Sequence, residues 1–279
     1  MISFIKSQFK IVKIEIIIFF ILLLIWTVPT LIQEYFSPYE IIDKYNGYYS
    51  STGGPGGSLL FKFFFFIPSM ILLPIFGVIL VNKLLLKEIS KGYFSSWLTT
   101  SMSRQKILNS KFFVILSSIL FLNISILLMQ LILFSSIFKD FNSQMALYLF
   151  LYFLSLIFFS ILFTSITWFI SCYFCDKQSL SIALISGVLT VFFVFYIIGH
   201  YASEIKGLEN LKYFDYFTIM SFLKPIIFNN PTHNQGVNLG NIQNFDFVNF
   251  AWQIPVVLIL IGGLFILGNW FFSKKDLFL

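Results

Sequence analysis

Six long apolar stretches divide this chain, and they constrain its fold more than any other feature of the sequence. A helix that crosses a bilayer needs roughly 20 mostly apolar residues. Soluble proteins carry about 25% charged residues, whereas only 11% of this chain is charged and 58% is hydrophobic. With so few polar side chains a water-soluble surface cannot be built, so lipid must surround most of the chain. The sequence predicts one all-α, polytopic transmembrane domain over 1–279, with helices at 14–33, 63–82, 112–134, 146–169, 180–198 and 251–271.

The basic residues indicate how these helices are oriented. If the N-terminus lies inside the cell, the inner segments hold twelve of the eighteen lysines and arginines. The loop at 83–111 alone holds six basic residues against the single acid Glu88. Cytoplasmic loops of membrane proteins are enriched in Lys and Arg, so both termini are predicted to be cytoplasmic (N-in/C-in). This distribution also explains the net charge of +6 without a nucleic-acid partner, and it leaves 34–58 and 201–249 as the large outer segments.

The interiors of the predicted spans contain almost no ionisable residues, and Glu15 is expected near an interface where it reaches water. Buried ionisable groups in membranes usually mark ion or proton pathways, so a carrier driven by ions is disfavoured. The polar residues that remain are interpreted as contacts between helices. They are Asn123 and Gln130 in the third span, and Ser160, Thr164, Ser165 and Thr167 in the fourth.

Other chemistry finds little support. The histidines, His200 and His233, both fall in outer segments, and no metalloprotease or serine-hydrolase motif accompanies them. The cysteines, Cys172 and Cys175, cannot form a disulfide framework, and a zinc site would need two more ligands. They are interpreted as two small apolar side chains on one helix face.

The loop at 83–111 is the most informative segment. Ile89, Tyr93 and Trp97 recur at a spacing of four residues. This spacing predicts an amphipathic helix from Glu88 to Met102 that lies along the membrane surface. Ser103 is then expected to cap a new helix that begins at Arg104.

At these residues the sequence resembles the ABC-2 type family of ABC transporter permeases. Members carry a Glu after the second span, a Gly four residues later, a Leu-rich stretch, a Ser-Arg or Thr-Arg, and a Lys at the start of the third span. The C-terminal run at 271–277 also resembles the family's ending. Two positions depart from the pattern: Ser101 replaces a frequent Pro, and Tyr93 replaces a frequent Ser or Thr. The matching residues here are Glu88, Gly92, Trp97, Leu98, Ser103, Arg104 and Lys111.

The resemblance implies that the loop is a coupling helix that docks on a separate ABC ATPase subunit. Glu88 and Arg104 would pair with each other or with the ATPase, or else anchor the loop at the membrane interface. Gly92 would permit close approach of helices, and Trp97 would be an aromatic anchor. No Gly-x-x-x-x-Gly-Lys-Ser/Thr motif occurs, so no cofactor is expected in this chain and ATP would bind to the partner subunit. A second permease chain, identical or different, and membrane lipid complete the expected partners.

The resulting hypothesis is a permease subunit of an ABC exporter for a hydrophobic, lipid-like or peptide-like solute, and not an enzyme in its own right. It would lie in the plasma membrane, and the heavy use of Phe, Ile and Asn suggests a bacterial source. Two alternatives stay open. One is an accessory or immunity membrane protein that acts by binding, and the other is a standalone carrier.

Overall fold

The computed structural model describes residues 2–36, 67–93, 102–137, 143–202 and 247–275, and within these ranges the chain forms helices and no strands. A bilayer imposes this outcome, because a helix satisfies its backbone hydrogen bonds within one segment. Each long helix overlaps one of the six predicted spans. The helices are α1 (Ile2–Phe36), α3 (Ile67–Val81), α6 (Arg104–Ile137), α7 (Ser143–Tyr173), α8 (Gln178–Ala202) and α9 (Phe247–Lys274).

Four helices are long and apolar enough to cross a membrane, namely the segments Arg104–Leu133, Phe153–Tyr173, Gln178–Phe195 and Ala251–Lys274. They overlap the predicted third to sixth spans. At the predicted second span, α3 has 15 residues before it continues into a π-helical turn, η3 (Asn82–Leu86), and a short helix, α4 (Lys87–Ser90). At the predicted first span, α1 carries several charges in its first half. The outer segments predicted at 34–58 and 201–249 lie almost entirely outside the described residues.

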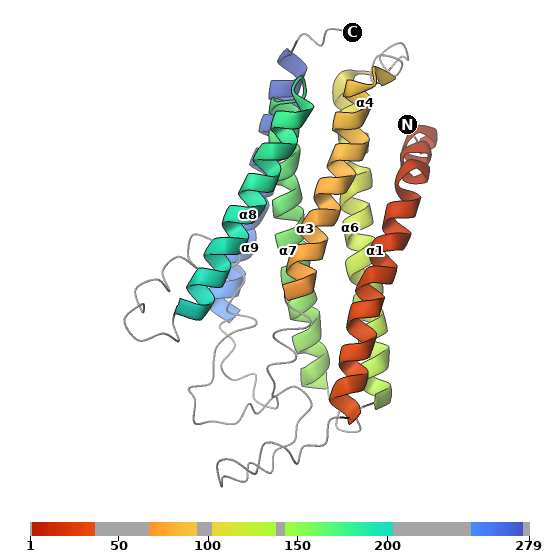
Figure 1. Cartoon of the computed structure of the whole chain (residues 1–279), viewed down its shortest axis with the longest axis vertical. Coiled ribbons are helices and arrows are strands. Elements are labelled where there is room, and N and C mark those ends of the chain that lie inside the picture. The colour runs from red at the N-terminus through yellow and green to blue at the C-terminus, as the bar shows by residue number, and fades with distance from the viewer. Residues whose placement is uncertain (1, 37–66, 94–101, 138–142, 203–246, 276–279) are drawn as a thin grey trace.

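The helices form a bundle in which α7 packs against α3, α6, α8 and α9, while α1 packs against α6 and α3. Figure 1 shows the start of α1, the short helix α4 and the end of α9 at one end of the bundle. We call this the termini end. The predicted N-in/C-in arrangement requires the start of α1, α4 and the end of α9 to share one side, as they do here. The side of the membrane that this end faces stays a prediction.

Toward the termini end, Leu84, Ile107, Trp168 and Phe272 are fully buried in one apolar cluster. Aromatic rings join three helices there. Phe112 of α6 stacks on Phe265 of α9 with centroids 4.4 Å apart, and it lies 5.2 Å from the ring of Trp168 in α7. Such ring pairs add to the energy of simple apolar burial, so α6, α7 and α9 are held together at this level.

The polar residues of the third and fourth spans are buried, but their hydrogen bonds differ from the expectation. The hydroxyls of Ser160, Thr164, Ser165 and Thr167 each donate to the carbonyl four residues earlier in α7. Asn123 donates in the same way within α6. These groups therefore bond within their own helices, because the helix's own carbonyls are the nearest acceptors. A contact between helices is found at Thr164, which packs against Gly77 of α3.

Candidate functional site

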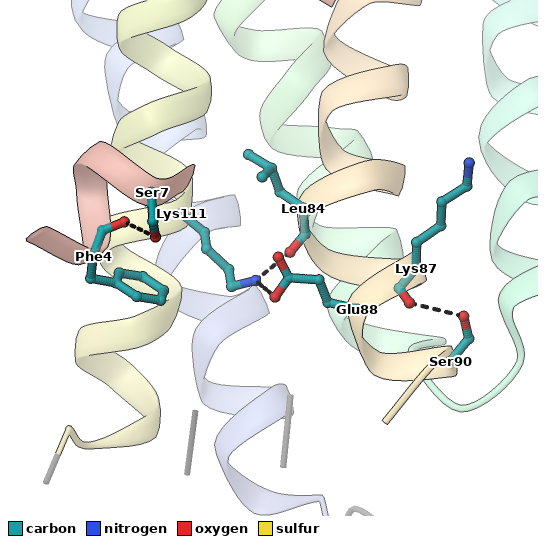
Figure 2. Close-up of polar contacts among 7 residues, drawn as sticks. All are labelled: Phe4, Ser7, Leu84, Lys87, Glu88, Ser90 and Lys111. Carbon is teal, nitrogen blue, oxygen red and sulfur yellow. Dashed lines mark hydrogen bonds and ion pairs between the residues drawn. The ribbon is translucent and has the colours of Figure 1, made fainter. Parts of the chain in front are cut away.

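A buried ion pair joins α4 to α6 at the termini end, as Figure 2 shows. The ammonium of Lys111 donates to Glu88 Oε2 and also to the backbone carbonyl of Leu84. Lys111 has no exposed surface, and the side chain of Glu88 is 9% exposed. Charges taken out of water persist only when they are paired and hydrogen-bonded, so these two residues depend on each other.

The π-helical turn η3, which leads into this pair, is tied to other helices. The Lys87 N–H bonds to Asn82 O, five residues back, which defines the widened turn. Lys83 forms an ion pair with Glu15 of α1, and Asn82 Oδ1 accepts a 3.3 Å hydrogen bond from Gln178 Nε2 of α8. π-Helical turns are rare in proteins, and those that do occur often lie at functional sites. Here η3 links α1 and α8 to the helix that carries Glu88.

Gly92 ends α4 in a left-handed turn. The N–H groups of Lys91 and Gly92 bond to the carbonyls of Lys87 and Ile89, and Gly92 has a φ of +70°. Glycine is the usual residue where a helix stops in this conformation. The prediction of an unbroken helix from Glu88 to Met102 is therefore wrong. Among the described residues, no atom lies within 4 Å of where a Cβ on Gly92 would be, so the requirement for glycine that the structure shows is the turn.

The other predicted residues of the loop have separate places. Ser103 Oγ accepts a 3.4 Å hydrogen bond from the Lys106 N–H at the start of α6, which confirms the predicted cap. Arg104 donates to the carbonyl of Lys275 at 3.1 Å and joins the start of α6 to the end of α9. The expected pairing of Glu88 with Arg104 is not what forms, because Lys111 lies on the face of α6 that meets α4. Trp97 and Leu98 lie outside the described residues.

A second polar group holds α6, α7 and α9 together at the same end. Trp168 Nε1 donates to Asn269 Oδ1 at 3.2 Å, and Asn269 Nδ2 donates to Asn109 Oδ1 at 3.0 Å. Sequence reasoning missed this chain of contacts. The signal for it was an amide, Asn269, near the end of the apolar stretch at 251–271.

Beyond the ends of α7 and α9, Lys275 Nζ lies 2.7 Å from Asp176 Oδ2. The hydrogen bond from Lys275 lowers the pKa of Asp176 below 3.8. Burial works to lower the pKa of Lys275, but its contacts with Asp176 and Cys175 outweigh this effect and raise its pKa above 10.5. Both groups are therefore charged between these values. The ion pair is lost only as the pH falls through the lowered pKa of Asp176 or rises through the raised pKa of Lys275.

The two cysteines are free and buried at this end of α7. Both belong to the apolar core cluster together with Trp168. Burial raises the pKa of the Cys175 thiol to about 11, which keeps it protonated and weakly reactive at neutral pH. These observations fit the interpretation of the C-x-x-C as two small core side chains.

Comparison with known proteins adds one finding to this geometry. The family model for ABC-2 family transporter proteins matches residues 5–277, which is nearly the whole chain. Neither the curated proteins nor the solved structures contain a match to the chain.

Proposed function

The chain belongs to the ABC-2 family of transporter proteins, and on this premise we propose that it is the permease subunit of an ABC exporter, driven by an ATPase on a separate chain. Its membership makes it a membrane transport component rather than a catalytic enzyme. The observation that carries the proposal further is the buried pair of Glu88 and Lys111. Both residues match the family's loop motif, and they lie where the loop at 83–111 leaves and re-enters the bundle.

A docking loop can drive a transport cycle only if its displacement moves the spanning helices. Lys111 joins η3 and α4 to the first turns of α6, because its ammonium donates to both the Glu88 carboxylate and the Leu84 carbonyl. Arg104 then joins the start of α6 to the end of α9. A force applied to the loop is therefore passed to α3, α6 and α9 rather than absorbed by a flexible hinge.

The topology proposed is six spans with both termini in the cytoplasm. Four helices support it by length and composition. The first span would be α1, and the second would be the continuous helical segment at 67–90. The excess of lysines and arginines in the loop at 83–111 favours the cytoplasm for the termini end, which is where a soluble ATPase would dock.

The solute proposed is hydrophobic or amphipathic, either lipid-like or peptide-like. The side chains that line the helices are overwhelmingly apolar, and the hydroxyls of Ser160, Thr164 and Thr167 in α7 bond to their own helix. A second permease chain would complete the pathway, as the family's architecture implies. The direction of transport, outward, is likewise proposed from the family.

Gly92 offers a test of the docking role with a matched control at the same position. Gly92→Pro is expected to abolish co-purification of an ABC ATPase with the tagged permease, because proline fixes φ near −65° where the turn needs +70°. Gly92→Asn should keep most of the ATPase co-purification, since asparagine tolerates positive φ. The measurement is the amount of ATPase recovered per permease in mild detergent. Equal recovery with the proline and asparagine variants would contradict docking through this turn.

A further inference from the structure

The helix α1 presents two different faces along its length. Phe4, Gln8, Val12 and Phe19 are buried and belong to the face that packs on the bundle. Lys6, Lys10 and Lys13 recur at intervals of four and three residues, which places them on one stripe of the helix, and all three are exposed. We call these three residues the lysine row. It lies on the side of α1 that faces away from the other helices.

No carboxylate of the described residues forms an ion pair with the lysine row. Among the described residues, the ion pairs are Lys83 with Glu15, Lys111 with Glu88, and Lys275 with Asp176. The nearest acid along α1, Glu15, is therefore already engaged by Lys83 of η3. Three adjacent ammonium groups without a carboxylate form a site for an anion of matching size.

The same stripe continues as an apolar surface. Ile14 and Ile17 lie four residues after Lys10 and Lys13, Ile21 and Ile25 continue at intervals of four, and Ile14 and Ile25 are 65% and 63% exposed. At a rise of 1.5 Å per residue, the lysine row covers roughly 10 Å of the helix axis. Headgroups add roughly 10–15 Å to the hydrocarbon core over both leaflets, and lysine side chains reach along the helix toward them. The charged surface of α1 is therefore followed by an apolar surface, in the same order as the headgroup and acyl chains of a phospholipid.

We propose that this face of α1 binds an anionic phospholipid, with its phosphate on the lysine row and its acyl chains along the isoleucine stripe. Free phosphate would satisfy the lysines but leave the isoleucines without a partner. A second copy of the chain that docked through the same face by two-fold symmetry would bring two rows of like charge together. The anionic lipid satisfies both halves of the stripe at once. The lipid can bind in this way on either side of the membrane, and its binding does not require an ATPase.

The test uses the full chain purified in mild detergent and titrated with phosphatidylglycerol, with phosphatidylcholine and inorganic phosphate as separate arms. Binding to the folded state raises the melting temperature. We expect the melting temperature to rise with phosphatidylglycerol but not with phosphatidylcholine or inorganic phosphate. In the variant Lys6→Gln/Lys10→Gln/Lys13→Gln the affinity should fall by about fivefold for each lysine removed. The variant with three arginines at these positions should retain the affinity.

The matched control is Lys87→Gln/Lys91→Gln/Lys106→Gln, which removes the same charge from exposed lysines at the same end of the bundle. It should keep the wild-type response to phosphatidylglycerol. Equal losses in the two glutamine variants would show that only net charge matters and would overturn the proposal. A wild-type response to inorganic phosphate as large as that to the lipid would overturn it too. The proposal would also be overturned if Lys6→Gln/Lys10→Gln/Lys13→Gln kept the wild-type lipid affinity but lost a second protein that co-purifies with the wild type. That result would make the lysine row a protein contact. Melting temperatures without lipid check that every variant is folded.

Discussion

Replacing Lys111 with methionine is expected to destabilise the protein by about 3–5 kcal/mol, the largest effect of any single substitution considered for this molecule. The substitution leaves the carboxylate of Glu88 without its partner in a site where only 9% of that side chain is exposed. It also removes the donor to the Leu84 carbonyl. Since whole domains are stable by about 5–15 kcal/mol, the variant should reach much lower levels in the membrane and melt at a much lower temperature.

Two companion variants separate the buried charge from the loss of a lysine as such. Lys106→Met removes an exposed lysine one turn earlier in α6 and should change stability little. The double variant Glu88→Leu/Lys111→Met replaces the whole pair with apolar side chains, which is often close to neutral in stability. We therefore expect recovery of most of the lost stability in the double variant. A melting temperature of Lys111→Met equal to that of Lys106→Met would contradict the buried pair.

The second large effect is expected at Gly77 in α3. A Cβ placed there would lie 2.3 Å from Oγ1 and 3.4 Å from Cβ of Thr164 in α7. The two helices approach closely because this residue has no side chain, a common device between membrane helices. Gly77→Ala should therefore cost about 1–3 kcal/mol as an overpacking change, read as a lower melting temperature in detergent.

The sign of the effect distinguishes packing from helix propensity. In a helix interior alanine is favoured over glycine by about 1 kcal/mol. Gly187→Ala in α8 should therefore be neutral or stabilising, since no atom of the described residues lies within 4 Å of the added Cβ. Gly77→Ala combined with Thr164→Ala removes the clashing hydroxyl and should regain much of the loss. If both alanine variants stabilised the protein, the close contact between α3 and α7 would be refuted.

The positions of the helices could be predicted from the sequence, but their lengths could not. The third predicted span, 112–134, is the apolar part of a helix that runs from Arg104 to Ile137, and the first, 14–33, belongs to a helix that begins at Ile2. Hydropathy detects the lipid-facing part of a helix, whereas the hydrogen bonds of the backbone continue past the membrane surface. The cap at Ser103 was predictable because a cap depends on local sequence alone.

The contacts between helices were beyond the sequence. Periodicity places Glu88 and Lys111 on faces of their helices, but it does not state which faces meet. The partners considered for Glu88 were therefore Arg104, the ATPase and the membrane interface, and Lys111 was not among them. The widened turn at 82–86 has no local signature among its leucines. Gly92 was recognised as important, but its positive φ was not predicted, because the sequence does not state where α4 ends. The family motif identified the residues, and the structure shows what the described ones contact.

The central proposal is that an ABC ATPase docks on the loop after α4, and site-specific photocrosslinking in intact cells tests it most directly. A photoreactive amino acid in place of Tyr93, which is 58% exposed at the start of this loop, should form a crosslink to an ABC ATPase subunit identified by mass spectrometry. The same probe at Ile132, which is 64% exposed near the other end of α6, should form none. An efficient probe at Tyr93 that crosslinks no ATPase, or a crosslink to the ATPase from Ile132 instead, would contradict the account.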